Sequence, residues 1–150
     1  MSDTPEELGI KLEVVAIPVA DVDRAVGFYR SLGWRLDNDL EVGPEFRAVQ
    51  FTPPGSECSI HVGRGVTTLA PGSVQGTYLV VSDINRARAD LVSKGVEVSE
   101  VFHNSYDTGV PERVDGYPAD GGNYSALASF SDPDGNGWLL QEVRERLPGR

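Results

Sequence analysis

Residues 130–143 read Phe-Ser-Asp-Pro-Asp-Gly-Asn-Gly-Trp-Leu-Leu-Gln-Glu-Val and combine a tight turn with an apolar run. Pro133 fixes φ at the first corner, Gly135 and Asn136 tolerate a positive φ, and aspartate side chains accept hydrogen bonds from nearby backbone N–H groups. We therefore predict a β-hairpin that closes on a final strand. The chain carries a weaker copy of this turn, Thr-Pro-Pro-Gly-Ser at 52–56, which also precedes a strand-like run.

The segments that precede the two turns also repeat. Residues 21–36 align with residues 83–98 without a gap. The two segments share Asp21 and Asp83, Arg24 and Arg86, Ala25 and Ala87, Ser31 and Ser93, and Gly33 and Gly95. An aspartate N-cap, apolar residues at helical spacing and a terminal glycine are typical of a helix. We therefore predict helices at about residues 21–32 and 83–94, one in each copy of an internal repeat.

Strand-like segments flank both predicted helices. We predict strands at residues 11–19, 34–40, 46–51 and 58–62 in the first copy, and at residues 76–82 and 96–102 in the second. Pro18 cannot donate to a sheet ladder, so we expect the first strand to fray there or to lie at a sheet edge. The prediction is an α+β fold of two tandem βαβββ modules with a mostly antiparallel, eight-stranded sheet surface. A single domain, residues 1–150, would hold module 1 at about 11–62, a linker at 63–75 and module 2 at about 76–143.

An insertion at residues 103–123 interrupts the second copy and is rich in Gly, Pro, Asp and Asn. Long loops in compact domains are either functional or disordered. We favour an ordered, lid-like loop, because Tyr106, Val110, Val114 and Tyr117 give it apolar side chains to pack. Residues 1–9 and 144–150 are expected to be a mobile tail and an exposed tail, respectively.

Composition and charge restrict the function. The net charge of −10 argues against binding nucleic acid, whose phosphates would be repelled. The same charge would favour a cationic ligand, or it is simply a solvated acidic surface. We expect no membrane span, because no segment is long and apolar enough. Cys58 is the sole cysteine, and no signal peptide is evident in the acidic start, so we expect a cytoplasmic protein.

Residues 19–29, Val-Ala-Asp-Val-Asp-Arg-Ala-Val-Gly-Phe-Tyr, resemble the start of the first helix in the vicinal oxygen chelate superfamily. This superfamily includes glyoxalase I, extradiol dioxygenases, fosfomycin-resistance enzymes and bleomycin-resistance proteins. The Asp-Pro-Asp-Gly-Asn turn at 132–136 resembles its last hairpin, and the similarity covers about residues 11–143. The resemblance implies that each module curls into a half-barrel around a small-molecule cavity, and that the chain forms a homodimer.

The resemblance also implies positions for a divalent metal. The enzymes of the superfamily place a histidine seven residues before each capping aspartate, where this chain has Val14 and Gly76. Their last strands supply a glutamate, where this chain has Ser59 and Leu139, or His61 and Gln141 after a shift of two residues. Most of these side chains are poor metal ligands, so we expect no metal and no other cofactor. An alternative is a site of His61 and His103 completed by Asp107, Asp120 or Glu100.

Two functions remain open. In the first, the cavity sequesters an organic or cationic small molecule, as the resemblance to the bleomycin-resistance proteins implies. The candidate ligand-binding residues are Trp34, Gln50, His61, Tyr78, His103 and Gln141. In the second, the protein is a lyase, isomerase or dioxygenase, and His61 or His103 is an acid–base group or an unconventional metal ligand. Three of the candidates also have a structural interpretation: a hydrogen-bonded structural histidine for His61, a loop-boundary histidine bound to the backbone for His103, and core or dimer packing for Trp34.

Overall fold

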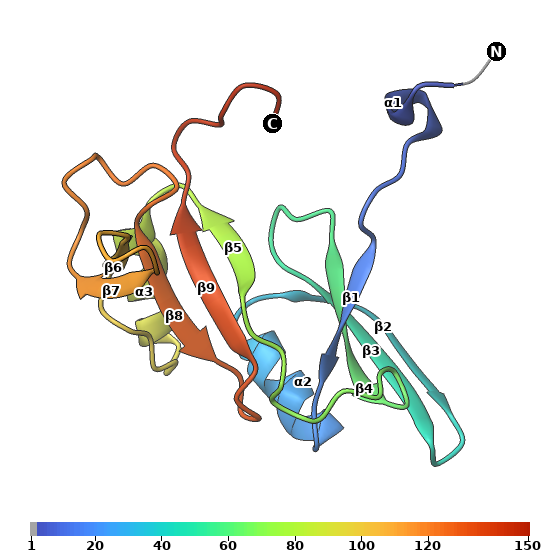
Figure 1. Cartoon of the computed structure of the whole chain (residues 1–150). Helices are drawn as coiled ribbons and strands as arrows, with labels where there is room; N and C mark the ends of the chain where they lie inside the picture. The colour runs from blue at the N-terminus through green and yellow to red at the C-terminus, as the bar shows by residue number, and fades with distance from the viewer. Residues whose placement is uncertain (1–2) are drawn as a thin grey trace. The chain divides into compact units, whose positions relative to one another are not determined.

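A computed structural model describes residues 3–150, which form nine strands and three helices. The chain divides after Leu69 into two compact units. Unit 1 contains a four-stranded sheet and unit 2 a five-stranded sheet, and neither sheet closes into a barrel within the described residues (Figure 1). None of the described helices is long and apolar enough to cross a membrane.

Unit 1 follows the predicted order of elements. Its elements are α1 (Pro5–Leu8), β1 (Val14–Pro18), α2 (Val22–Ser31), β2 (Arg35–Val42), β3 (Phe46–Thr52) and β4 (Ser59–Arg64). The sheet order is β1-β4-β3-β2, with β1 parallel to β4 and the other pairs antiparallel. Pro18 ends an edge strand, as predicted, because its missing N–H is harmless there.

Helix α2 begins and ends where its sequence predicts. The Asp21 carboxylate accepts a hydrogen bond from the Arg24 N–H at 3.0 Å, and Gly33 adopts a φ of 83° just after the helix. Tyr29 of α2 is fully buried, and its ring centroid lies 6.0 Å from that of Phe51 on β3. The sheet face that carries Phe51 therefore packs against α2.

The opposite face of this sheet, which we call the open face of unit 1, carries polar side chains. Strand residues alternate between faces, and register partners share a face. Val49, Phe51, Ile60 and Val62 lie on the helix side and are buried. Gln50, Thr52, Ser59 and His61 alternate with them and lie on the open face.

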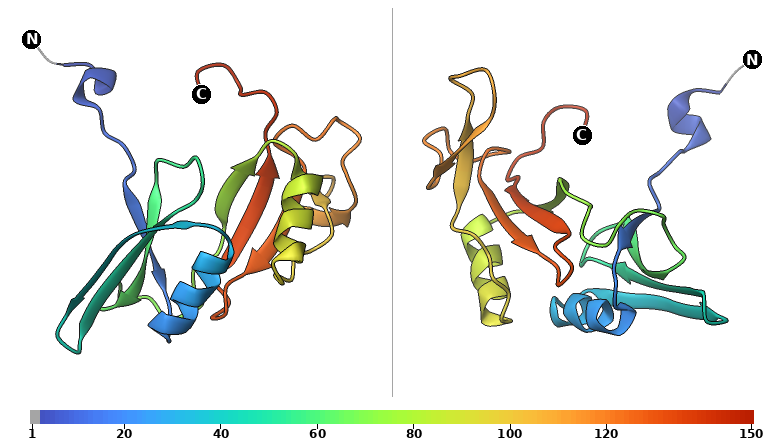
Figure 2. Two further views of the ribbon diagram at one scale, coloured as in Figure 1. Left: turned by 180° about the vertical axis from the view of Figure 1, so that it is seen from behind. Right: turned by 60° about the horizontal axis from the view of Figure 1, so that its bottom comes forward.

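Unit 2 repeats the arrangement of unit 1. Its elements are β5 (Thr77–Val81), α3 (Ile84–Ser93), β6 (Phe102–Ser105), β7 (Glu112–Asp115), β8 (Leu127–Ser131) and β9 (Gly137–Glu142). The sheet order is β5-β9-β8-β6-β7, and the first strand again runs parallel to the last, as β1 and β4 do. Helix α3 packs against β8 and β9, and it lies in front of the sheet in the left view of Figure 2. The α+β fold with two modules is thereby confirmed, although unit 2 has one strand more than βαβββ, so that the two sheets hold nine strands rather than the predicted eight.

Two predictions in unit 2 need correction. The strand predicted at 96–102 is wrong, since a strand begins only at Phe102. Instead, the Ser99 backbone N–H donates to the Ser129 carbonyl oxygen of β8, and the Ser99 hydroxyl oxygen accepts from the Ser129 backbone N–H, both at 2.9 Å, which interrupts regular pairing. The insertion at 103–123 is not only a loop, because β6 and β7 form a hairpin inside it. The guanidinium of Arg113 lies 3.8 Å from the centroid of the Phe102 ring and covers that hairpin.

The N-terminal segment, which was predicted to be a mobile tail, contains a short helix that was not predicted. Thr4 caps α1 and accepts from the Glu7 N–H at 3.3 Å, while the Glu7 carboxylate accepts from the Thr4 N–H at 2.7 Å. This reciprocal pair is a capping box, and Pro5 occupies the first helical position. Residues 1–2 lie outside the described residues.

The final hairpin is confirmed. The Asp132 carboxylate accepts hydrogen bonds from the backbone N–H groups of Asp134 at 3.0 Å and Asn136 at 2.9 Å. Phe130 and Trp138 are register partners on either side of the turn, and their rings stack with centroids 6.4 Å apart. Both rings are buried, so the turn and the core of unit 2 stabilise the same register.

Candidate functional site

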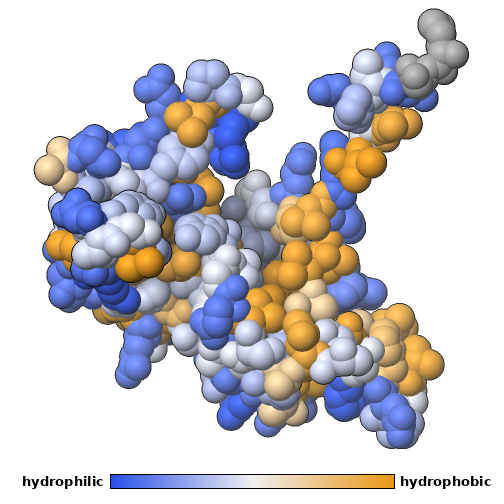
Figure 3. Space-filling view, viewed as in Figure 1, coloured by the Kyte–Doolittle hydropathy of each residue, from blue (hydrophilic) through white to orange (hydrophobic). Residues whose placement is uncertain are grey.

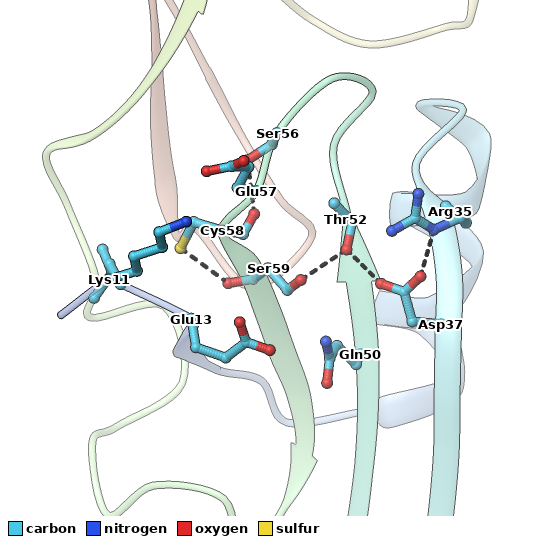
Figure 4. A pocket seen from close by; sticks show the side chains of 11 residues that line it. Lys11, Glu13, Arg35, Asp37, Gln50, Thr52, Ser56, Glu57, Cys58 and Ser59 are labelled. Carbon is cyan, nitrogen blue, oxygen red and sulfur yellow. Dashed lines mark hydrogen bonds and ion pairs between the residues drawn. The ribbon is translucent and has the colours of Figure 1, made fainter. Parts of the chain in front are cut away.

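A pocket of about 730 Å³ opens on unit 1 beside the ends of β2, β3 and β4 (Figure 4). Strands β2, β3 and β4 supply five of its eleven lining residues, and the segment before β1 and the loop between β3 and β4 supply three each. The lining residues are Lys11, Leu12, Glu13, Arg35, Asp37, Gln50, Thr52, Ser56, Glu57, Cys58 and Ser59. Only one of these, Gln50, is among the ligand-binding residues predicted from the sequence.

Four of the lining side chains form a continuous series of hydrogen bonds, which we call the polar chain. The Ser59 and Thr52 hydroxyl oxygens lie 2.7 Å apart, and the Thr52 hydroxyl group donates to the Asp37 carboxylate. The Arg35 guanidinium donates to the other oxygen of Asp37. The hydrogen bonds from Arg35 and Thr52 hold the pKa of Asp37 below its usual value, so the carboxylate is ionised at neutral pH.

Local strand geometry brings the polar chain together. Arg35 and Thr52 are register partners on β2 and β3. The register then shifts between Leu36 and Asn38, so Asp37 occupies an irregular position of the kind found in a β-bulge. A bulge re-aims a side chain, which here places the Asp37 carboxylate against Thr52.

Gln50 and His61 lie beside the polar chain on the open face. They are register partners, and the His61 Nε2 lies 3.2 Å from the Gln50 Oε1. Because the amide oxygen can only accept, Nε2 carries the proton in this pair. The structure thus unites two of the predicted residues in unit 1, although only Gln50 lines the pocket.

The charges around the pocket are mixed. Lys11 and Arg35 oppose the carboxylates of Glu13, Asp37 and Glu57. Cys58 is half-buried there, and its thiol lies 3.5 Å from the Ser59 carbonyl oxygen. The arrangement offers donors, acceptors and both signs of charge in one pocket, which suits binding of a polar organic molecule.

The metal site implied by the family resemblance does not fit the residues that are present. Val14 and Ser59 are direct register partners on the parallel strands β1 and β4. Valine has no donor atom, and the Ser59 hydroxyl group is already bonded to Thr52. Among residues 3–150, no group of three or more His, Cys, Asp or Glu side chains is placed to hold a metal ion.

The remaining predicted residues have other surroundings. Trp34 is only 8% exposed and packs on Tyr29 with centroids 5.3 Å apart, in the core of unit 1. Tyr78 in unit 2 is 51% exposed. It lies on the same sheet face as Gln141, because the partner of Gln141 is two residues further along β5. The Gln141 amide donates to the Tyr124 carbonyl oxygen at 2.9 Å.

His103 is a member of β6 and lies on the opposite side of the unit 2 sheet from Gln141. Phe102 pairs with Leu127, which pairs with Gln141, so these three share a face and His103 alternates away from it. The His103 Nδ1 is 2.9 Å from the Gly116 carbonyl oxygen. This backbone contact matches the structural interpretation of His103.

A second, smaller pocket lies in unit 2. It measures about 380 Å³ and is lined by Ser82, Asp83, Asn85, Tyr117, Glu142 and Arg144. Glu142 is 3% exposed, and its two oxygens accept from the Ile84 N–H at 3.1 Å, the Arg144 guanidinium at 2.9 Å and the Tyr117 hydroxyl group. These bonds join β9 to the start of α3, so the polar side chains of this pocket have a structural role that needs no ligand.

Comparisons with known proteins agree with the fold. The sequence model of the Glyoxalase/Bleomycin resistance protein/Dioxygenase superfamily matches residues 11–140. No match was found among curated proteins.

Solved structures resemble the chain along almost its whole length. TnmS3, an antibiotic binding protein from Streptomyces sp. CB03234, is 28% identical, with a TM-score of 0.67 over 89% of this chain and 96% of that chain. A glyoxalase/bleomycin resistance protein from the same strain is 28% identical, with a TM-score of 0.64 over 88% and 100%. A superfamily member from Sphaerobacter thermophilus DSM 20745 is 26% identical, with a TM-score of 0.68 over 90% and 98%. This chain therefore belongs to the Glyoxalase/Bleomycin resistance protein/Dioxygenase superfamily.

Proposed function

We propose that this protein binds an organic small molecule in the pocket of unit 1 and releases it chemically unchanged. The observation that carries the proposal is the pocket itself, about 730 Å³ in volume and lined mainly by polar side chains, five of them on strands β2, β3 and β4. Sites for small organic ligands have volumes of roughly 300–1,000 Å³ and a few fixed polar groups. The excess of carboxylates over cationic groups in its lining suits a cationic ligand.

The relatives support a ligand of the antibiotic class. TnmS3 is an antibiotic binding protein, and its similarity to this chain extends over 89% of the chain. Family membership alone supports an enzyme equally well, since one fold hosts many activities. The poor fit of Val14 and Ser59 to a metal favours binding over a metal-dependent lyase, isomerase or dioxygenase.

Calorimetric titration of the full chain with a panel of cationic and neutral antibiotics tests the proposal. We expect at least one compound to bind, and mass spectrometry of the recovered compound should show an unchanged mass. Gln50→Leu, which removes the lining amide, should weaken binding, whereas Asn85→Ala in the second pocket should not. Chemical conversion of a bound compound would instead support the enzyme interpretation.

We also propose that the protein acts as a homodimer. Several large apolar side chains of unit 1 are exposed, including Leu12 at 70%, Leu40 at 48% and Val42 at 61%. Figure 3 shows apolar residues gathered over β1 and the chain before it. Exposed apolar patches of this kind often mark protein interfaces. Sedimentation analysis should give a mass near twice 16.2 kDa, and a monomer at micromolar concentration would contradict the proposal.

A further inference from the structure

The polar chain fixes the direction of each of its hydrogen bonds. Asp37 is ionised, because Arg35 and Thr52 lower its pKa, and an ionised carboxylate can only accept. The Thr52 proton must therefore point to Asp37. A hydroxyl group has one proton, so the Thr52 oxygen can only accept from Ser59, at 2.7 Å.

Ser59 consequently presents no proton to the pocket. Its hydroxyl proton is donated to Thr52, and its backbone N–H is donated to the Glu13 carbonyl oxygen at 2.8 Å. What remains at the Ser59 side chain is a pair of oxygen lone pairs in the wall of the pocket. Towards the pocket, the Ser59 hydroxyl group therefore acts as a hydrogen-bond acceptor, although a serine hydroxyl group can in general both donate and accept.

Gln50 supplies a hydrogen-bond donor to the same wall of the pocket. Its amide oxygen accepts from the His61 Nε2 at 3.2 Å, so the amide NH₂ group is the part left for a ligand. Among residues 3–150 this NH₂ group has no hydrogen-bond partner. Gln50 lies two residues before Thr52 on the same face of β3, and Figure 4 shows its side chain beside Thr52 and Ser59. An acceptor and a donor thus lie close together in one wall.

We propose that this corner of the pocket recognises a hydroxyl group of the ligand, either an alcohol or a phenol, which donates to the Ser59 oxygen and accepts from the Gln50 amide. A hydroxyl group does both through a single oxygen atom, which suits a donor and an acceptor that lie close together. An ammonium group would leave the Gln50 donor without a partner, and an ether or carbonyl group would leave the Ser59 lone pairs without one. This inference rests on the proposed function, because it concerns the same pocket.

The test uses three simple probes on the full chain, namely phenol, its methyl ether anisole, and benzylamine. Titrations followed by ¹⁵N-resolved NMR report on the Gln50 side-chain NH₂ and on the Ser59 backbone N–H. We expect phenol to shift both signals and to bind about fivefold more tightly than anisole, the ratio expected for one net hydrogen bond. Benzylamine should be the weaker binder relative to phenol at this corner.

Variants of the polar chain distinguish a loss of hydroxyl recognition from a general loss of binding in the pocket. Ser59→Ala and Thr52→Val should reduce the preference for phenol over anisole towards one. Thr52→Ser keeps a hydroxyl group at the centre of the chain and should retain the preference, as should Thr68→Val, an exposed threonine of the same unit. Thermal melting establishes that each variant folds. If Thr52→Val does not fold, the phenol and anisole affinities of Ser59→Ala and Thr52→Ser still test the inference.

The other outcomes are distinct. Equal shifts and equal affinities for phenol and anisole in the native protein would overturn hydroxyl recognition and leave the binding pocket in place. Tighter binding of benzylamine would overturn it in favour of an ammonium group. An absence of shifts at pocket residues with all three probes, together with no binder in the antibiotic panel, would overturn both this inference and the proposed function.

Discussion

His61 on β4 and Gln50 on β3 are register partners, with the His61 Nε2 3.2 Å from the Gln50 Oε1. In a sequestering protein this pair orients the Gln50 amide, and no proton transfer is needed. His61→Gln should therefore leave ligand affinity within about tenfold, or roughly 1.4 kcal/mol. Titration calorimetry with a binder from the antibiotic panel measures the effect.

His103→Gln is the companion variant, since His103 contacts the Gly116 carbonyl oxygen and lies away from the Gln141 face. It should also leave affinity within about tenfold. If either variant instead lost a measurable turnover by about a hundredfold with its fold intact, that residue would be an acid–base group and the enzyme interpretation would replace ours.

The repeat predicted the fold because its signals are local. Asp21 and Asp83 cap their helices as expected, each accepting from the N–H three residues later, and Gly33 and Gly95 both adopt a positive φ. The short helix α1 could also have been found, since Thr4 and Glu7 have the spacing of a capping box. The start of β6 could not, because the Ser99 hydroxyl group replaces a ladder bond through a contact with β8.

The pocket was mostly missed because distant segments build it. Strand alternation places Thr52 on the same face as Gln50, and Ser59 on the same face as His61, so this rule could have added Thr52 and Ser59 to the predicted ligand-binding residues. Asp37 was not predictable, since its contact with Thr52 depends on the shift of register between Leu36 and Asn38. Register irregularities are set by pairing with another strand and carry little local signal.

The positions of Val14 and Ser59 give a prediction about metals. Neither side chain offers a free, strong donor, so Ni²⁺, Zn²⁺, Fe²⁺ or Mn²⁺ at micromolar concentration should not raise the melting temperature. Differential scanning calorimetry with and without each ion measures this. A rise of several degrees, or a stoichiometric ion in protein purified without chelators, would contradict the expectation, because tight binding to the native state must stabilise it.

Arg47 links two strands and a helix of unit 1. Its guanidinium binds Asp39 through two bonds, 3.0 Å and 2.8 Å, and binds Asp23 of α2 at 2.8 Å. Arg47 lowers the pKa of Asp39 below its usual 3.8, so the stabilisation is fully present above that value and is lost as pH falls through the lower folded pKa. Asp39→Asn should therefore cost about 0.5–1 kcal/mol at pH 7, a small figure because Asp39 is 37% exposed.

Urea unfolding of the native protein and the Asp39→Asn variant from pH 7 downwards tests this dependence. The difference between the two free energies of unfolding should shrink once the pH falls below about 4, where Asp39 begins to be protonated in the unfolded state, and should be lost as the pH falls through the lower pKa of Asp39 in the folded state. Asp107→Asn, at an exposed aspartate of unit 2, is the control and should give a smaller difference. A difference that stays constant over the whole range would show that the carboxylate charge is not its source.

Removing the charge of the buried Glu142 carboxylate should destabilise the protein. Its oxygens accept from the backbone N–H of Ile84, the Arg144 guanidinium and the Tyr117 hydroxyl group, and it is 3% exposed. Glu142→Gln keeps the size of the side chain but removes the charge and turns an NH₂ group towards groups that themselves donate. We expect a loss of about 1–3 kcal/mol in the free energy of unfolding, the cost of an unsatisfied buried donor.

Urea unfolding measures this loss. The control variant Glu97→Gln, at an exposed glutamate of the same unit, should change the free energy of unfolding by less than about 0.5 kcal/mol. Equal effects of the two substitutions would mean that the bonds of Glu142 do not hold β9 to α3.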